Sequence, residues 1–449
     1  DESRGDTVSA VELSNALLKA LSKLYDEVAV VVVENEKTMV KLWNTELSVV
    51  QTWTETEINL RLAKSRRLWT VYLSARDPLY VVKSAEEIVK LADRIEEAEL
   101  YAPLPEPGEC DPLEDAYDVN VEALMKDPSK PVEAMVDEAL SNGAERVAGT
   151  LTLAKTSRVL LTSKGFQCTE KTTSIEAYIR AFKGEFSGHW AHGSTRLSLN
   201  DIRAVGRKAG LYATITSNRG DISPGTYNVV ISPLVAGNLL NYIAMMASAL
   251  SVMAGFSVFA KYKVGETIAS DDFTLLDKPR DPTLPHARGF DDEGLKTFNK
   301  PIIENGTVKT LLHNSGTALK MGDRSTGNAG WIRPVAWNLE VSGGEIKEEE
   351  LFSEVREGVV ITNNWYTRLQ NYYEGLFSTV SRDATLMVKN GEVTGYVGRV
   401  RMATSFPRFL SSIVGASRNR YDIWWWEVRT PTRTPYFILQ NIPITKPEV

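Results

Sequence analysis

The chain has 449 residues and a formal net charge of −7, with 43% hydrophobic and 24% charged residues. This length suits two or three domains, and the composition is that of an ordinary globular protein. The acidic balance argues against nucleic acid as the main partner, because phosphate binding usually needs a basic surface.

The first hundred residues predict a helix, three strands and a second helix. Apolar residues recur at helical spacing at both ends of this segment, and the middle is β-branched or alternates in polarity. The expected elements are a helix over 8–25, strands over 29–33, 39–53 and 58–73 with a turn at 35–37, and a helix over 85–100.

A proline-rich segment then breaks the chain. Prolines at 103, 105, 107 and 112 remove backbone donors and fix φ, which indicates a linker. After it we expect a helix over 132–141, strands over 147–161, 169–182 and 193–199, and a helix over 199–213.

From Pro224 onward the pattern predicts a strand, a long apolar helix and many short strands divided by turns such as Asn390-Gly391. Residues 239–260 are apolar enough to imitate a membrane span, but proline and glycine precede them and polar residues interrupt them. We therefore expect a buried helix and no membrane insertion.

These elements predict an α+β fold with three parts. Residues 1–102 form an N-terminal domain of antiparallel strands flanked by helices, and 103–220 form a linker with a small β-rich middle domain. Residues 221–449 form a mostly antiparallel β domain around the apolar helix.

Cysteine usage points to a cellular compartment. With only Cys110 and Cys168, the chain cannot form a disulfide framework or a thiolate zinc cluster, so we expect a reducing cytoplasm. Asp1–Asp6 is polar and lacks the basic start and apolar core of a secretory signal.

Histidine is the usual metal ligand and the usual base at neutral pH. None of the four histidines is followed by glutamate, so the chain has no His-Glu-x-x-His zinc motif. The best metal candidate is Glu185, His189 and His192, whose spacing would suit one helix face. Gly184 and Gly188 disfavour a helix, and in a strand residues three apart point to opposite faces. We therefore favour a glycine-rich turn with surface histidines.

Two further segments could carry chemistry. Asp291, Asp292 and Glu293 could bind a hard cation or act as an acid–base pair, although we favour a solvated loop whose carboxylates cap backbone amides. The loop Ser325–Gly330 could present backbone donors, but it lacks the lysine of a phosphate-binding loop.

Three consecutive tryptophans, Trp424, Trp425 and Trp426, lie at the end of an expected strand. Adjacent strand residues alternate between faces, so at least one of the three should be exposed or at an interface. This pattern fits a partner surface as well as it fits packing within a large β core.

Six short segments carry a resemblance, each weak alone but specific in this order. They are Gly225-Thr-Tyr-Asn-Val-Val-Ile-Ser-Pro233, Phe290-Asp-Asp-Glu-Gly294, Ile303-Glu-Asn-Gly306, Ser325-Thr-Gly-Asn-Ala329, Glu357-Gly-Val-Val360 and Asn390-Gly391. Over about 220–449 the chain thus resembles the TldD/TldE (PmbA) family of peptidase-related proteins.

The resemblance implies where a metal site would lie. In the TldD branch a helix carrying Leu-Leu-His-Glu-x-x-x-His follows the first segment; its histidines bind the metal, its glutamate is the base, and a later cysteine completes the site. Aligned after Leu239-Leu240, these positions are Asn241, Tyr242 and Met246, and no cysteine follows Cys168. None of the three suits a hydrolytic zinc site, because amide and thioether are poor ligands and an unperturbed tyrosine has a pKa near 10. The chain therefore resembles the TldE/PmbA branch, which lacks the metal motif.

The family implies an assembly, and the leading hypothesis is a non-catalytic subunit. It would complete a chamber around unfolded peptides, held by strand addition, while a TldD-like partner supplies the metal (zinc is expected) and the cleavage or maturation of peptides. One alternative is a hydrolase with its own site at Glu185, His189 and His192 or at Asp291–Glu293. The other is a homo-oligomeric peptide-binding module.

Overall fold

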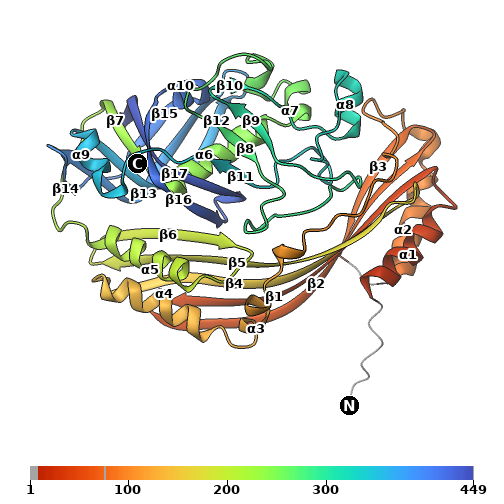
Figure 1. Ribbon diagram of the computed structural model, residues 1–449, viewed down its shortest axis with the longest axis horizontal. Helices are drawn as coiled ribbons and strands as arrows, with labels where there is room; N and C mark the ends of the chain where they lie inside the picture. The colour runs from red at the N-terminus through yellow and green to blue at the C-terminus, as the bar shows by residue number, and fades with distance from the viewer. Residues whose placement is uncertain (1–8, 75–76, 448–449) are drawn as a thin grey trace.

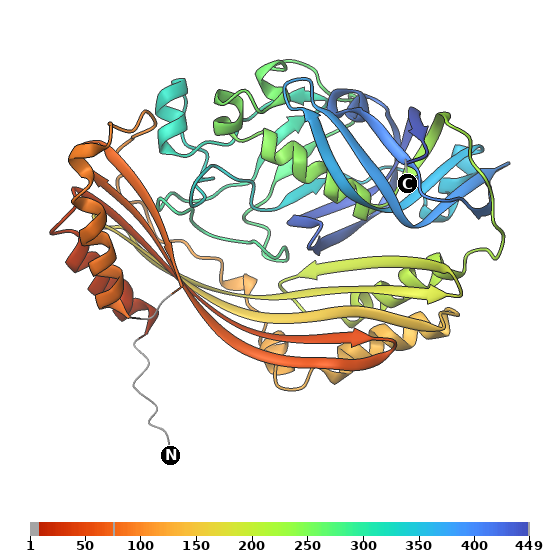
Figure 2. The ribbon, with the colours of Figure 1, turned by 180° about the vertical axis from the view of Figure 1, so that it is seen from behind.

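The computed structural model describes residues 9–74 and 77–447 and contains two β-sheets, A and B, that face each other (Figures 1 and 2). The predicted α+β class is confirmed. Expectations for Asp1–Asp6 and for the start of the first helix at Val8 lie outside the described residues.

Sheet A is a long, curved, fully antiparallel sheet in the order β3-β2-β1-β4-β5-β6. Its strands are β1 (Glu27–Trp43), β2 (Glu46–Lys64), β3 (Arg67–Leu73), β4 (Arg146–Thr162), β5 (Gln167–Lys183) and β6 (Phe186–Ser194). Strands from both sides of the proline-rich linker therefore share one sheet. The strand expected over 193–199 is displaced, because β6 ends at Ser194 and a helix begins at Leu199.

The turn expected at 35–37 is wrong, because β1 runs through it without a break. Strands on both sides satisfy the backbone there. The polar side chains pair across the sheet: Thr156 donates to Asn35 at 2.7 Å, and the Lys37 ammonium lies 3.1 Å from Glu55. The turn lies instead at Asn44–Thr45, where φ is positive.

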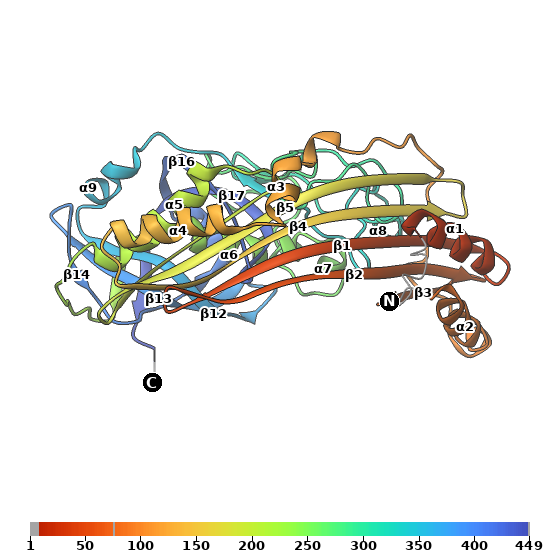
Figure 3. The same ribbon diagram turned by 90° about the horizontal axis from the view of Figure 1, so that it is seen from below.

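Helices cover the convex face and one end of sheet A, as the view from below shows (Figure 3). The expected helices over 132–141 and 199–213 are confirmed. The helix expected over 85–100 begins earlier, because the Asp77 side chain caps it by accepting a hydrogen bond from Leu79 N at 2.9 Å. A short helix at Val119–Leu124 was not predicted. The helices are α1 (Ala10–Leu21), α2 (Pro78–Val89), α3 (Val119–Leu124), α4 (Ser129–Ser141) and α5 (Leu199–Thr214).

Sheet B has 11 strands over the described residues and lies above the concave face of sheet A (Figure 1). Most pairs are antiparallel, but β7–β12 and β11–β17 are parallel. The strands are β7 (Gly225–Ile231), β8 (Leu275–Asp277), β9 (Lys300–Glu304), β10 (Thr307–Val308), β11 (Leu339–Val341), β12 (Gly358–Asn371), β13 (Leu376–Lys389), β14 (Glu392–Tyr396), β15 (Arg401–Ser405), β16 (Ile413–Trp425) and β17 (Val428–Thr445).

The apolar helix is confirmed as a buried one, but it is shorter than expected and is divided in two. Its parts are α6 (Pro233–Met246) and α7 (Ala249–Met253), and α6 packs in the core of sheet B. The remaining short helices are α8 (Ser315–Met321), α9 (Leu351–Val355) and α10 (Phe406–Ser411). Across residues 9–74 and 77–447, every helix falls short of the length and hydropathy that a membrane-spanning helix needs.

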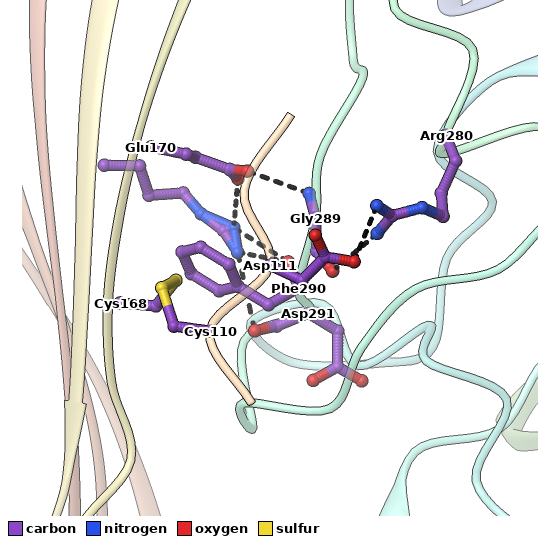
Figure 4. The surroundings of a disulfide bond; sticks show 9 residues. Cys110, Asp111, Cys168, Glu170, Arg280, Gly289, Phe290 and Asp291 are labelled. Carbon is purple, nitrogen blue, oxygen red and sulfur yellow. Dashed lines mark hydrogen bonds and ion pairs between the residues drawn. A yellow bond between two sulfur atoms is a disulfide. The ribbon is translucent and has the colours of Figure 1, made fainter. Parts of the chain in front are cut away.

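Cys110 and Cys168 form a disulfide that joins the linker to β5, with 5.3 Å between their Cα atoms (Figure 4). Because the two cysteines pair with each other, cysteine usage no longer supports a reducing compartment. The linker folds back across sheet A, which brings together two cysteines 58 residues apart. Disulfides are usual in oxidising compartments and also occur inside hyperthermophiles.

Polar contacts around the disulfide connect the linker, sheet A and the loop between β8 and β9, residues 278–299 (Figure 4). Asp111 accepts from Arg280 at 2.9 Å and lies 2.6 Å from the Lys296 ammonium. Gly289 N donates to Glu170 of β5 at 2.8 Å. A Cβ at Gly289 would lie 2.1 Å from the Asp111 carbonyl oxygen, so the linker approaches this loop as closely as glycine permits.

Candidate functional site

Helix α6 occupies the position where the family resemblance places a metal-binding helix. Strand β7 leads directly into it, and Ser232 caps it by accepting from Leu234 N at 3.2 Å. Pro233 at the first helical position is compatible with the start because its missing N–H would have no helical partner. Three side chains decide what this helix can do: those of Asn241, Tyr242 and Met246.

Asn241 connects α6 to the start of β17. Its amide nitrogen donates to Gly237 O at 2.9 Å, to Thr430 O at 3.0 Å and to Thr432 Oγ1 at 3.0 Å. Its amide oxygen accepts from Thr430 N at 2.8 Å. Both ends of the amide are therefore used within the protein, and Asn241 holds a helix against a strand.

Tyr242 and Met246 are also used within the protein. The Tyr242 hydroxyl donates to Thr367 O at 3.1 Å, and its ring is stacked with Phe406 at 6.4 Å between centroids. Burial raises the pKa of Tyr242, which leaves it protonated at neutral pH and unsuited to act as a base. Met246 is fully buried in the core. These residues do not fit a hydrolytic metal ion.

Asn238, one turn earlier on α6, belongs to a polar network that the sequence did not reveal. Its oxygen accepts from Asn364 at 2.9 Å and from Thr367 at 2.7 Å, and Asn364 also donates to Thr379 at 2.9 Å. Beside this network a cavity of about 420 Å³ opens, lined by Asn238, Asn241 and Tyr242 among others. The helix face therefore borders a space large enough for a small ligand.

A larger groove of about 610 Å³ lies between the concave face of sheet A and two loop segments of the C-terminal half, within 285–292 and 330–337. Strands β1, β2, β4 and β5 form its floor, and residues around Trp331, Trp337 and Trp424 form its other wall. Arg333 and Val335 line both this groove and the cavity beside α6, so the two spaces adjoin. Together they offer a continuous polar and aromatic surface.

The three tryptophans follow the predicted alternation at the end of β16. Trp425 is buried at 3% exposure, whereas Trp426 is 60% exposed, which confirms that at least one faces outward. Trp424 contacts the His286 ring at 5.5 Å between centroids and lines the groove. Trp426 lines the cavity beside α6.

The structure does not bring Glu185, His189 and His192 together. Both histidines are buried on β6, so the expected glycine-rich turn with surface histidines is wrong for them, and residues three apart on a strand face opposite ways. The two histidines are buried because strands β13 and β16 of sheet B pack against β6, the edge strand of sheet A. Glu185, exposed in the β5–β6 turn, instead accepts from Arg219 at 2.8 Å.

The acidic segment is structural, and it is not the solvated loop that we expected. Asp291 is fully buried and accepts from the backbone nitrogens of Glu293, Leu295 and Ala329 at 2.9–3.1 Å. Burial, reinforced by the Glu293 charge, raises the pKa of Asp291 to about 7. The expected capping of backbone amides is thus observed, but away from solvent.

The loop Ser325–Gly330 also uses its polar groups internally. Asn328 donates to Asp277 at 2.6 Å and to Val335 O at 2.8 Å, and Ala329 N is bound by Asp291. In the described part of the chain, no set of three or more His, Cys, Asp or Glu side chains is arranged to hold a metal ion.

Comparisons with known proteins agree with this arrangement. Sequence models of the PmbA/TldA metallopeptidase family match residues 81–215 as its central domain and 224–446 as its C-terminal domain. The chain therefore belongs to the PmbA/TldD metallopeptidase family.

Individual relatives are more distant. A metalloprotease of Methanothermobacter thermautotrophicus is 24% identical over 58% of this chain and 60% of its own length. Metalloprotease PmbA of Escherichia coli O157:H7 is 26% identical over 43% of this chain and 42% of its own length. The chain thus matches less than two thirds of these relatives.

The fold similarity extends over nearly the whole chain. The crystal structure of TldE from Thermococcus kodakarensis superposes with a TM-score of 0.85 at 20% identity, covering 96% of this chain and 100% of that one.

Proposed function

We propose that this chain is the non-catalytic, TldE/PmbA-like subunit of a TldD/TldE-type metalloprotease, and that it holds unfolded peptide segments for cleavage by a TldD-like partner. The observation that supports the proposal most directly is the set of hydrogen bonds made by the side-chain amide of Asn241. Its amide joins α6 to β17 through three hydrogen bonds, with a fourth to Gly237 O within the helix, at the position where the resemblance expects a metal-binding histidine.

The groove supports the peptide-holding part of the proposal. It is lined by strands and aromatic side chains and is continuous with the cavity beside α6, so an extended segment could cross from one to the other. Tryptophan faces suit such contacts because they offer large apolar area with little loss of side-chain entropy.

An open strand edge supports the assembly part. Strand β3 pairs only with Ile58–Lys64 of β2, and in the described residues no strand covers the outer edge of 46–55. Around the turn between β1 and β2, beside this edge, apolar side chains are exposed: Trp43 at 72%, Leu47 at 63% and Val50 at 59%. An exposed apolar edge can pair with a strand of another chain.

The test is reconstitution with a TldD-like chain from the same genome. We expect this chain alone to leave an unfolded peptide intact and to hold no stoichiometric metal. The mixture should elute as one complex and cleave the peptide, and a chelator should stop the cleavage. Chelator-sensitive cleavage by this chain alone would refute the proposal.

A variant separates assembly from peptide holding. Ile332 is 74% exposed on the groove wall. Ile332→Glu should slow cleavage by the complex while leaving complex formation intact, because it places a charge in the groove and touches no core residue. Leu319→Glu, also at a 63% exposed position but outside the groove lining, is the matched control and should cleave normally.

A further inference from the structure

A third cavity, of about 410 Å³, lies where the end of sheet A meets β13 and the end of β16. Residues of β1, β4, β5 and β6 form one side of it, and Arg382 with Trp425 and Trp426 forms the other. Neither the replaced metal positions nor the groove wall belong to it. Trp426 also lines the cavity beside α6, so the two spaces are neighbours.

The charges that line this cavity are all positive. Lys41, Arg180 and Arg382 line it, and its lining contains no aspartate or glutamate. Arg180 is neutralised by the buried Asp383, at 2.7 Å and 3.1 Å. In the described part of the chain, Arg382 has no carboxylate within 4.0 Å; its guanidinium faces the Trp365 ring at 5.3 Å. Arg382 therefore lines the cavity, in the described structure, without a carboxylate in direct contact.

Burial intensifies this imbalance. Partial burial lowers the pKa of the Arg382 guanidinium and the nearby Arg180 lowers it further, whereas the charges of Asp383 and Glu427, which are not in contact with it, raise it. A positive charge held in a low dielectric beside another arginine is stabilised by any anion that enters. The arrangement therefore favours an anionic ligand.

His189 supplies the second polar group. It lines the cavity, is 2% exposed, and neither of its ring nitrogens has a hydrogen-bond partner in the described structure. Its ring lies 4.4 Å from that of Trp425 between centroids. Burial lowers the pKa of His189 to about 3, with Arg180 contributing, so the imidazole is neutral and offers one donor and one acceptor. Buried polar groups without partners are rare in native proteins and usually bind water or a ligand.

Aromatic rings form much of the remaining wall. Trp43 and Trp426 are exposed at its mouth, whereas Tyr178 and Trp425 are deeper. Planar side chains pack well against such rings, and a carboxylate fits the two-pronged geometry of a guanidinium.

We propose that this cavity binds a carboxylate carried by a peptide, with Arg382 and His189 as donors and the tryptophans packing against the adjoining side chain. The inference rests on the proposed function only in taking the ligand to be a peptide. The carboxylate could come from the C-terminus of the peptide or from an acidic side chain, and the test separates these sources.

The test measures binding of three fluorescently labelled peptides to the purified chain at pH 7 by anisotropy. Two share one sequence with an aromatic residue near the end and carry either a free C-terminal carboxylate or a C-terminal amide; the third is the amide with its penultimate residue replaced by glutamate. We expect the free acid, or the glutamate peptide if the side chain is the source, to bind at least tenfold more tightly than the plain amide.

Two variants assign the effect to the cavity. Arg382→Gln should abolish the preference for the carboxylate, and since Arg382 is in no ion pair within 4.0 Å in the described structure, it leaves no buried carboxylate unpaired. Arg399→Gln is the matched control, because Arg399 also faces Trp365, at 5.5 Å, but does not line the cavity. It should keep the preference. Melting temperatures of both variants check that they fold.

The outcomes separate this inference from the proposed function. Equal affinity for all three peptides, with cleavage by the reconstituted complex intact, overturns the carboxylate site alone. If no peptide binds but N-acetyltryptophan binds in an Arg382-dependent way, the site stands and the peptide-holding role falls. A preference for the carboxylate that survives in Arg382→Gln, or the absence of all binding, overturns the inference.

Discussion

Replacing Cys110 with serine should destabilise the protein measurably, because it opens the disulfide that ties the linker to β5. The loop that the disulfide closes spans 58 residues. For a loop of this size, the lost constraint on the unfolded chain amounts to roughly 14 cal/mol/K, or about 4 kcal/mol at 25 °C. Cys110 itself is exposed, so the substitution leaves no cavity.

The free energy translates into a melting temperature. At roughly 2.1 cal/mol/K per residue, unfolding of the whole chain as one unit has an entropy of about 0.9 kcal/mol/K, so the expected decrease in melting temperature is about 4 °C. Differential scanning calorimetry of the wild type and of Cys110→Ser, each with and without reductant, measures it. The reduced wild type should melt with the variant, and reductant should leave the variant unchanged.

Glu109→Ser is the matched control, an exposed position next to Cys110 in the same linker. It should melt with the wild type, and denatured wild type should show no free thiol. The reasoning is refuted if Cys110→Ser melts with the oxidised wild type, or if reductant leaves the wild type unchanged.

Three further substitutions test the packing around the site. Asn241→Ala should cost about 1–3 kcal/mol in chemical denaturation, since it leaves Thr430 N without its acceptor; an unchanged midpoint would contradict its structural role. Gly289→Ala should cost about 1–3 kcal/mol, because the new Cβ overlaps the Asp111 carbonyl, and wild-type melting would show that this contact is looser. His189 has its pKa lowered to about 3, so the unfolded state takes up a proton below about pH 6.5 that the folded state refuses, and stability falls as pH decreases from 6.5 toward 3. His189→Phe should lose roughly 1 kcal/mol less per pH unit in that range, as measured by urea unfolding at pH 7, 6 and 5; parallel losses would contradict this assignment.

Local signals in the sequence predicted several elements well. The helix expected over 132–141 is α4, which ends just before the turn-forming pair Asn142-Gly143, and Asn390-Gly391 indicated the turn between β13 and β14. These features depend on neighbours along the chain, so a single sequence contains them. The turn expected at 35–37 failed for the opposite reason, because β2 and β4, distant in sequence, hold that polar run in a strand.

In the candidate site, too, some features follow from the residue types alone and others from contacts between distant segments. The match of three α6 positions to the metal site of the TldD branch stays a prediction from the resemblance. The sequence by itself determined that none of Asn241, Tyr242 and Met246 suits a hydrolytic zinc site, since ligand chemistry depends only on which side chains are present. It could not reveal Arg382, because an arginine without a carboxylate in direct contact is recognised only by what surrounds it. Tertiary structure alone decided the disulfide, the burial of His189 and the cavities, because each arises from segments that are far apart in the chain and meet only in the folded protein.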